Sequence, residues 1–163
     1  MFAPVIIDIE ASGFGPDSYP IEVGAVLANG RRFSRLIKPF PEWQYWSNEA
    51  AAMHGISRSL LEQRGHNGHE VAHELNLLLA GQQTYSDCWV VDKPWLDKLF
   101  FQAGLPMQFI LSPIEALLPD EQIACWDRVK LDVINQLNVK RHRASTDALI
   151  IQQTFMASRK LIA

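Results

Sequence analysis

The first apolar segment of the chain ends in two carboxylates, and this ending limits what the chain can fold into. Residues 4–9 form a short apolar run that closes with Asp8-Ile9-Glu10. In a strand, residues i and i+2 point to the same face, so Asp8 and Glu10 project together. Two like charges this close are costly without a cation, and hard divalent cations prefer oxygen ligands. The pair suits a metal site at the end of a strand, but taken alone it is better explained by a strand that simply ends in a polar loop.

The opening part of the chain has the patterns of strands. Residues 4–9, 21–27 and 32–37 are short runs in which β-branched residues are frequent or apolar residues alternate with basic ones. Asn29-Gly30, between the second and third segments, is a strong hairpin signal. We therefore expect three strands in an antiparallel meander.

The rest of the chain alternates between helical and strand-like segments. Apolar residues at helical spacing predict helices over residues 47–53, 57–63, 69–79, 94–103 and 119–138, and a last helix that begins at Ala144 or Ser145. Short strands are expected at residues 84–86 and 109–111. A start rich in hairpins followed by alternating helices and strands predicts an α/β fold with a mixed sheet.

Composition identifies the class of protein but not its partner. A chain of 163 residues that is 48% hydrophobic can bury a core without disulfides, and the separation of Cys88 and Cys125 favours free thiols. The formal net charge of −3 excludes only a domain that binds nucleic acid through overall positive charge. No apolar run approaches the roughly 20 residues that span a bilayer, and no signal peptide is recognisable, so we expect a cytoplasmic protein with no membrane partner.

Two later segments carry further candidate ligands. Asp92 follows the apolar pair Val90-Val91 and precedes an expected helix, a position from which it could return to the same sheet edge. His142 and Asp147 lie in HRASTDA at the start of the last helix. Asp147 alone is explained by the helix dipole, and a nearby Ser or Thr by ordinary capping. The combination with the first acidic pair favours a shared metal site.

These segments resemble the DEDDh 3′-to-5′ exonucleases, a family that includes proofreading subunits of bacterial replicative polymerases, RNase T and oligoribonuclease. IIDIEASGF is similar to the first motif of the family, VDKPWL to the second and HRASTDA to the third. Residues 53–57 are similar to a segment that recurs before the second motif. The resemblance covers residues 4–157 and implies a ribonuclease-H-like fold, with a five-stranded mixed sheet flanked by helices. We expect a single exonuclease domain over residues 1–163.

The resemblance also implies a reaction. It implies hydrolysis of phosphodiester bonds at the 3′ end of single-stranded DNA or RNA, with release of nucleoside 5′-monophosphates and with two divalent cations, Mg or Mn. The implied metal ligands are Asp8, Glu10, Asp92 and Asp147. His142 would accept the proton of the attacking water, a role that suits an imidazole with a reference pKa of about 6.5. A solvated loop residue or a phosphate contact is the alternative for His142.

The second motif departs from the family. Many members carry His-Asn ahead of the acidic ligand, whereas this chain has Asp87-Cys88-Trp89. Asp87 and Asp97 are competing candidates for the ligand, and the spacing of the motif favours Asp92. Substrate contacts in this segment are therefore open.

Other residues are candidates for substrate binding. Gly13 would let the backbone approach the terminal sugar while Phe14 stacks on a base. The resemblance suggests that Met53 and His54 pack against the last nucleotides. Ordinary core packing is the alternative for Phe14 and Met53. For Trp43, Tyr45 and Trp46, which we expect to be exposed, a homodimer interface, a nucleic-acid surface and a packed loop are all open.

A second metal motif competes with the first. His69-Glu70-Val71-Ala72-His73 matches the HExxH pattern of zinc peptidases, in which both histidines bind zinc. A zinc peptidase would leave the three acidic segments unexplained, so exposed helix residues are the better interpretation. A non-catalytic nucleic-acid-binding module on the same fold is the third hypothesis.

Overall fold

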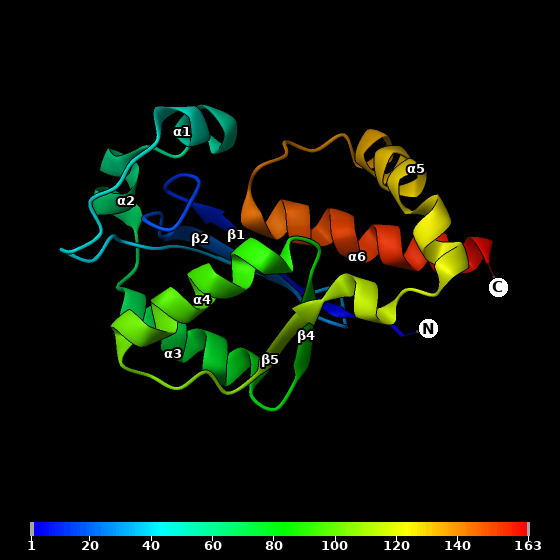
Figure 1. The fold of residues 1–163 in the computed structure, drawn as a ribbon, viewed down its shortest axis with the longest axis horizontal. Coiled ribbons are helices and arrows are strands. Elements are labelled where there is room, and N and C mark those ends of the chain that lie inside the picture. The colour runs from blue at the N-terminus through cyan, green and yellow to red at the C-terminus, as the bar shows by residue number, and fades with distance from the viewer. Residues whose placement is uncertain (1, 163) are drawn as a thin grey trace.

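The strand that ends in the two carboxylates lies at the centre of the sheet. In the computed structural model, which describes residues 2–162, five strands form one sheet in the order β3-β2-β1-β4-β5 (Figure 1). The strands are β1 (Val5–Ala11), β2 (Pro20–Val26), β3 (Arg32–Leu36), β4 (Gln83–Ser86) and β5 (Ile110–Pro113). β1 pairs antiparallel with β2 and parallel with β4. The expected α/β fold with a five-stranded mixed sheet is confirmed.

The turn between β2 and β3 forms where Asn29-Gly30 predicted it. Gly30 has φ +80°, a left-handed conformation that glycine adopts without a steric penalty. Its N–H donates to the Leu27 carbonyl at 2.9 Å, and the Arg31 N–H donates to Asn29 Oδ1 at 3.0 Å. These bonds turn the chain back so that β3 runs antiparallel to β2, which confirms the expected meander.

The helices largely occupy the expected segments. They are α1 (Asn48–His54), α2 (Arg58–Arg64), α3 (Gly68–Leu79), α4 (Trp89–Ala103), α5 (Asp120–Leu137) and α6 (Ala144–Leu161). Ser47 and Ser57 cap α1 and α2, because their hydroxyls accept from the backbone N–H groups of Ala50 and Leu60. A 3₁₀ turn at Ile114–Leu117 was not predicted, because four residues are too few to show a period.

The start of α4 differs from the prediction. The helix begins at Trp89 rather than near Pro94, so Asp92 lies inside the first turns of the helix instead of before it. A proline inside a helix removes one backbone donor, here the partner of the Val90 carbonyl. Val90 is exposed, so water can satisfy that carbonyl. The helix therefore tolerates Pro94 and carries Asp92 toward the end of β4.

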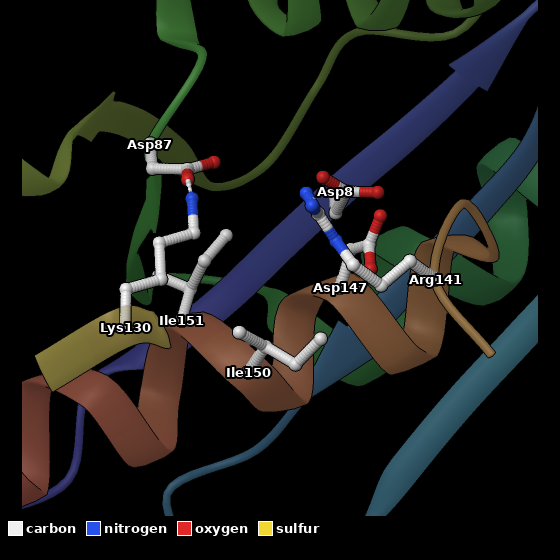
Figure 2. A pocket seen from close by; sticks show the side chains of 7 residues that line it. All are labelled: Asp8, Asp87, Lys130, Arg141, Asp147, Ile150 and Ile151. Carbon is white, nitrogen blue, oxygen red and sulfur yellow. Dashed lines mark hydrogen bonds and ion pairs between the residues drawn. The ribbon is translucent and has the colours of Figure 1, made fainter. Parts of the chain in front are cut away.

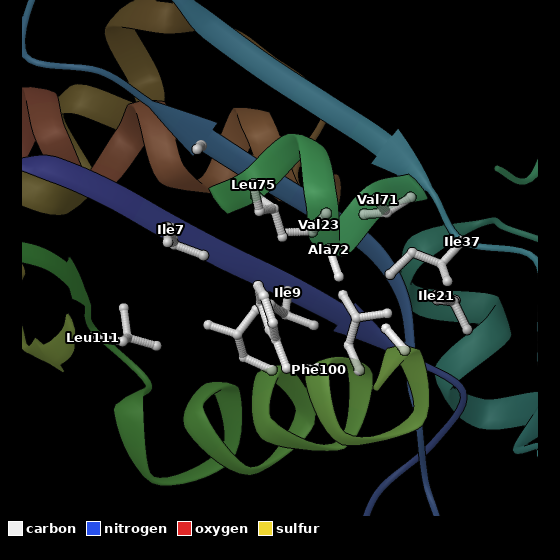
Figure 3. Close-up of a cluster of buried hydrophobic side chains, with 14 of the residues drawn as sticks. Ile7, Ile9, Ile21, Val23, Ile37, Val71, Ala72, Leu75, Phe100 and Leu111 are labelled. Carbon is white, nitrogen blue, oxygen red and sulfur yellow. The ribbon is translucent and has the colours of Figure 1, made fainter. Parts of the chain in front are cut away.

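The sheet has a helical layer on each face. α3 and α4 cover one face, where Ile7 and Ile9 of β1 pack with Leu75 of α3 and Phe100 of α4 in the largest apolar cluster (Figure 3). α6 covers the other face, and α5 packs against α6. On that side Ile6 contacts the apolar residues of α6 in a smaller cluster. β1 is thus buried between two layers, and only its carboxyl end opens toward polar side chains.

The aromatic segment after β3 is partly a core element. Trp43 is only 7% exposed, stacks on Tyr19 at 5.1 Å between ring centroids and meets the edge of Phe40. The expectation that Trp43 is exposed was therefore wrong. Tyr45 is exposed, as expected, and Trp46 is half-buried. Packing against Tyr19 explains Trp43 without an interface.

Two further features concern the chain as a whole. Cys88 and Cys125 are free thiols, as their separation predicted. Within residues 2–162, no helix combines the length and the apolar character needed to cross a membrane.

Candidate metal and nucleic-acid site

Asp8 and Glu10 lie near the carboxyl end of β1, beside the parallel strand β4. The carboxyl ends of parallel strands meet at one edge of a sheet, where α/β folds form ligand-binding crevices. The chain leaves β4 at Ser86 and enters α4, which carries the buried side chain of Asp92. The Ser86 hydroxyl donates to Asp92 Oδ2. The register of β1 with β2 also shifts between Glu10 and Ala11, an irregularity of the kind that re-aims side chains next to functional sites.

The start of α6 brings His142 and Asp147 to the same place. The His142 backbone N–H donates to Asp147 Oδ2 at 3.0 Å, and His142 has φ +61°, which is uncommon for a residue other than glycine. Asp147 Oδ1 is buried without a hydrogen-bond partner. One ligating atom each from Glu10, His142 and Asp147 lies within 4.8 Å of the others. Residues far apart in the sequence therefore converge on one point.

The carboxylates of this cluster disfavour one another's charge. Burial raises the pKa of Asp8 well above its usual value, and Asp92, Glu10 and Asp147 raise it further. Burial, then the charge of Asp147, raises the pKa of Glu10 to about 8. Burial raises the pKa of Asp92 to about 7, against the opposing effect of the Ser86 hydrogen bond. Like charges that share a desolvated site behave in this way.

The donor chemistry of the cluster fits hard divalent cations. Its oxygen ligands are those that Mg²⁺ and Mn²⁺ prefer, and a bound cation would compensate the repulsion between the carboxylates. The buried Oδ1 of Asp147 has no hydrogen-bond partner, so it is free to accept a cation. Asp8, Glu10, Asp92 and Asp147, the four carboxylates that the sequence offered as metal ligands, all line this site.

Two adjoining hollows lie over the cluster. A cleft of about 380 Å³ is lined by all four carboxylates and His142, together with Phe14, Cys88, Trp95 and neighbouring residues. A smaller hollow of about 70 Å³ is lined by Glu10 and by the four residues expected to contact substrate, which are Gly13, Phe14, Met53 and His54. Phe14 and Trp95 line both hollows, so the two adjoin at these side chains.

The side chains of the smaller hollow differ in their surroundings. Phe14 is 54% exposed and Met53 48% exposed, so the alternative that they are core residues was wrong. His54 is buried, its Nδ1 accepts from the Ile56 N–H at 3.0 Å, and burial lowers its pKa. This bond leaves the proton of the neutral ring on Nε2. His54 is thus held in one orientation, whereas Phe14 and Met53 offer free apolar surface.

Gly13 has a packing role that the sequence did not indicate. A Cβ at this position would lie 2.5 Å from the Tyr45 ring and 3.0 Å from Ser47 Cβ. The neighbouring Ser12 carbonyl accepts from the Ser47 N–H at 2.8 Å. The glycine therefore lets the loop after β1 pack against the segment that leads into α1.

A third hollow of about 120 Å³ lies on another side of Asp8 and Asp147. Figure 2 shows Arg141, from the loop before α6, extending its guanidinium toward these two carboxylates. Asp87 lines the same hollow but is paired with Lys130 of α5 at 2.5 Å. Asp97 is exposed and bonded to Lys93 at 2.6 Å. Of the three competing aspartates, Asp92 is therefore the one that lines the cleft with the other acids.

Glu22 and Gly24 of β2 are neighbours of the site that sequence reasoning missed. Capping by Ser145 or Thr146 was the ordinary alternative for this segment, but both hydroxyls accept from Arg32. Glu22 Oε2 instead accepts the Ala144 N–H at 3.0 Å. A Cβ on Gly24 would lie 2.0 Å from the Ser145 nitrogen, so only glycine lets α6 approach β2 this closely. The one sign of this role in the sequence was a charged residue, Glu22, within the otherwise apolar segment PIEVGAV.

The HExxH segment does not form a metal site. His69, Glu70 and His73 are all exposed on α3, while Val71, Ala72 and Leu75 point into the core. Across residues 2–162, the group of three or more suitably spaced ligating side chains is Glu10, His142 and Asp147. The zinc-peptidase hypothesis therefore lacks the metal site that it requires.

Comparison with solved structures identifies similar folds. A structure of E. coli exonuclease I in complex with a dA16 oligonucleotide has a TM-score of 0.68 at 12% identity, over 97% of this chain and 40% of that chain. Another exonuclease I structure has a TM-score of 0.71 at 13% identity over the same shares. Exonuclease I from Methylocaldum szegediense has a TM-score of 0.59 at 13% identity, over 77% of this chain and 30% of that one.

These likenesses show the fold. They confirm the expected ribonuclease-H-like arrangement of a mixed sheet flanked by helices. The chain spans 40% or less of the length of these solved chains. No protein-family model and no curated protein sequence matches the chain.

Proposed function

We propose that the chain is a metal-dependent 3′-5′ exonuclease that acts on single-stranded nucleic acid and releases nucleoside 5′-monophosphates. The observation that carries this proposal is the convergence of four carboxylates and one imidazole, from β1, α4 and the start of α6, on one cleft. The similar structures include E. coli exonuclease I in complex with a dA16 oligonucleotide and in a complex with single-stranded DNA, which supports single-stranded DNA as a substrate. The resemblance of the sequence motifs extends the proposal to RNA and to residues 1–163 as a single exonuclease domain.

Asp8, Glu10, Asp92 and Asp147 would hold two divalent cations, Mg²⁺ or Mn²⁺. When bound, such cations supply an activated water and stabilise the departing 3′-oxygen. Asp8 lies close to the other three carboxylates, whose charges all raise its pKa. Glu10 has a second role beside the reacting phosphate, because it lines both the acidic cleft and the smaller hollow.

His142 would accept the proton of the attacking water. Its side chain lines the acidic cleft, and its backbone N–H is bonded to Asp147 Oδ2. This bond ties the orientation of the loop to that of a metal ligand and leaves Asp147 Oδ1 free. A general base held in this way contributes roughly 10²- to 10⁴-fold to a rate.

The terminal nucleotides would lie against the smaller hollow. Phe14 and Met53 offer exposed apolar surface for the bases, and His54 and Gly13 form the wall next to the sugar. Because Glu10 lines the same hollow, a nucleotide bound there has its phosphodiester close to the carboxylates. Aromatic stacking is tolerant of sequence, which suits an enzyme that removes any nucleotide.

Digestion of matched single-stranded DNA and RNA, each labelled at the 5′ end, tests the proposal. Wild-type protein with Mg²⁺ or Mn²⁺ should produce a ladder that shortens from the 3′ end, together with free nucleoside 5′-monophosphates. Asp8→Ala and Asp147→Ala should abolish the ladder, because several kcal/mol of charge stabilisation is lost. His69→Ala, an exposed change on α3, is the matched control and should digest normally.

Three outcomes would contradict the proposal. Binding of both oligonucleotides without digestion would favour a non-catalytic nucleic-acid-binding module. Equal loss of digestion in the folded His69→Ala protein would contradict the site. Internal cleavage without a preference for the 3′ end would contradict the exonuclease assignment.

A further inference from the structure

We propose that Glu22 is a positioning residue of this site, which holds His142 and Asp147 in place through Arg143 and the start of α6. This inference rests on the proposed function, but the contacts that support it involve no substrate. Glu22 is a fifth carboxylate beside the cluster, and it is not one of the four expected metal ligands.

Glu22 and Glu10 are directly opposed across β1 and β2. The side chains of such a pair lie on the same face of a sheet, about 5 Å apart at Cβ. Glu22 therefore sits on the acidic side of β1 and is only 1% exposed. A second buried carboxylate next to Glu10 adds repulsion, so its presence calls for a specific role.

The hydrogen bonds of Glu22 distinguish it from the metal-ligand candidates. Its oxygens accept from Arg143 Nη2 at 2.7 Å and Nε at 3.0 Å, from the Ala144 N–H at 3.0 Å and from Ser34 Oγ at 3.1 Å. A carboxylate offers about four lone-pair sites, so these donors leave little capacity for a cation. By contrast, Asp147 Oδ1 has no partner at all.

The partners of Glu22 lie directly beside the residues that would act in the reaction. Arg143 follows His142 in the chain, and Ala144 is the first residue of α6. Asp147 comes one turn later and accepts from the His142 N–H. A two-pronged pair between arginine and a carboxylate fixes direction as well as distance. One buried side chain therefore restrains both ends of the His142–Asp147 bond.

The backbone of β2 supports the same arrangement. Gly24, two residues after Glu22, allows Ala144 and Ser145 to lie against the strand without a Cβ between them. Arg143 supplies no side-chain cap to α6, so the Glu22 carboxylate takes the place of one. A carboxylate at a helix N-terminus is also favoured by the helix dipole.

The variant Glu22→Gln tests this role, because it keeps the shape of the side chain and removes the charge. We expect kcat for 3′-end digestion to fall about 10- to 100-fold, the usual cost of losing a group that orients metal ligands, with KM for the oligonucleotide unchanged. Mn²⁺ affinity, measured by calorimetry, should fall in the same range. Hydrogen exchange of the His142 amide should become faster, because its bond to Asp147 is no longer restrained.

The controls separate positioning from folding. Glu74→Gln removes another acid that forms an ion pair with an arginine, 2.8 Å from Arg35 Nε, and should leave all three readouts unchanged. If Glu22→Gln does not fold, Arg143→Lys replaces it, because lysine keeps the charge but loses the two-pronged geometry. Arg143→Lys should change the same readouts in the same direction.

The exchange measurement needs no activity, so failure of the proposed function and failure of this proposal are distinguishable. Inactive wild-type protein whose His142 amide still exchanges faster after Glu22→Gln would overturn the exonuclease function only. A folded Glu22→Gln protein with unchanged kcat, Mn²⁺ affinity and His142 exchange would overturn the positioning role. A lower Tm with these three readouts unchanged would overturn it equally, because Glu22 would then serve folding alone.

Discussion

The two faces of β1 have opposite roles, and alternate residues of the strand point to each face. Ile7 and Ile9 point into the layer formed by α3 and α4, where they are 0% and 5% exposed. Asp8 and Glu10 point to the other side, where their carboxylates repel Asp92 and Asp147. A buried isoleucine contributes roughly 1.5–3 kcal/mol to folding, whereas the acids oppose folding whenever they are charged without a cation. The apolar face therefore stabilises a strand whose acidic face is kept for chemistry.

Replacement of His142 should have a large effect on the acidic side. We expect His142→Asn to lower kcat about 100- to 10,000-fold, because the proton acceptor is lost. Asparagine tolerates the left-handed backbone at φ +61°, so the fold should be retained. Initial rates of digestion measure the change, with His73→Asn, an exposed histidine on α3, as the control. Retention of more than about a fifth of the activity would argue against a general base here.

Ile7→Ala and Asp8→Asn test the comparison of the two faces on neighbouring residues. Ile7→Ala should lower the free energy of unfolding by about 2–5 kcal/mol, through lost burial and a cavity. Asp8→Asn should raise it in metal-free protein at alkaline pH, because a buried, repelled charge is removed. Urea unfolding in the presence of a chelator measures both. If Ile7→Ala is too unstable to fold, Ile7→Val should cost about 0.5–1.5 kcal/mol. A lower free energy of unfolding for Asp8→Asn would contradict the conclusion that the charged acidic face opposes folding.

The stability of the metal-free protein should depend on pH in an unusual direction. The pKa of Asp92 is raised to about 7 and that of Glu10 to about 8 in the folded state. A raised acid binds more protons when folded than when unfolded, so its stabilising contribution is present at low pH and is lost as pH rises toward these values. Tm measured with a chelator should therefore fall between about pH 5 and pH 8.

Divalent cations should reverse the loss of stability that the metal-free protein shows as pH rises. Addition of Mg²⁺ should raise Tm more at about pH 8 than at about pH 5.5, because the ligands must be charged to bind. Asp92→Asn should flatten the pH dependence and weaken the Mg²⁺ effect. An equal Mg²⁺ effect at both pH values would contradict a site made of these carboxylates.

Local sequence patterns were enough for the parts of the molecule that depend on neighbours in the chain. The alternation in β1 predicted which side chains share a face, and Asn29-Gly30 predicted the β2–β3 turn. The start of α4 was predicted too late in the chain, because Pro94 was expected to exclude the helical turn before it. That turn forms because the carbonyl that Pro94 leaves unpaired is exposed to water. Glu22 and Gly24 were missed because their roles depend on contacts with residues 143–145, more than a hundred positions away. No short-range pattern encodes such a contact.

Replacement of Phe14, at the edge of the acidic face of β1, should have the smallest effect on activity. It follows β1 closely in the chain, yet its ring is exposed rather than packed into the core. Stacking on one base is worth about 1–3 kcal/mol, so Phe14→Ala should raise KM about 5- to 150-fold with kcat little changed. Phe101→Ala is the matched control, because Phe101 is 86% exposed on α4 and lies outside both hollows of the site. If the two variants have the same KM, the exposed ring of Phe14 does not bind the nucleic acid. The function of this face then lies in its charged residues alone.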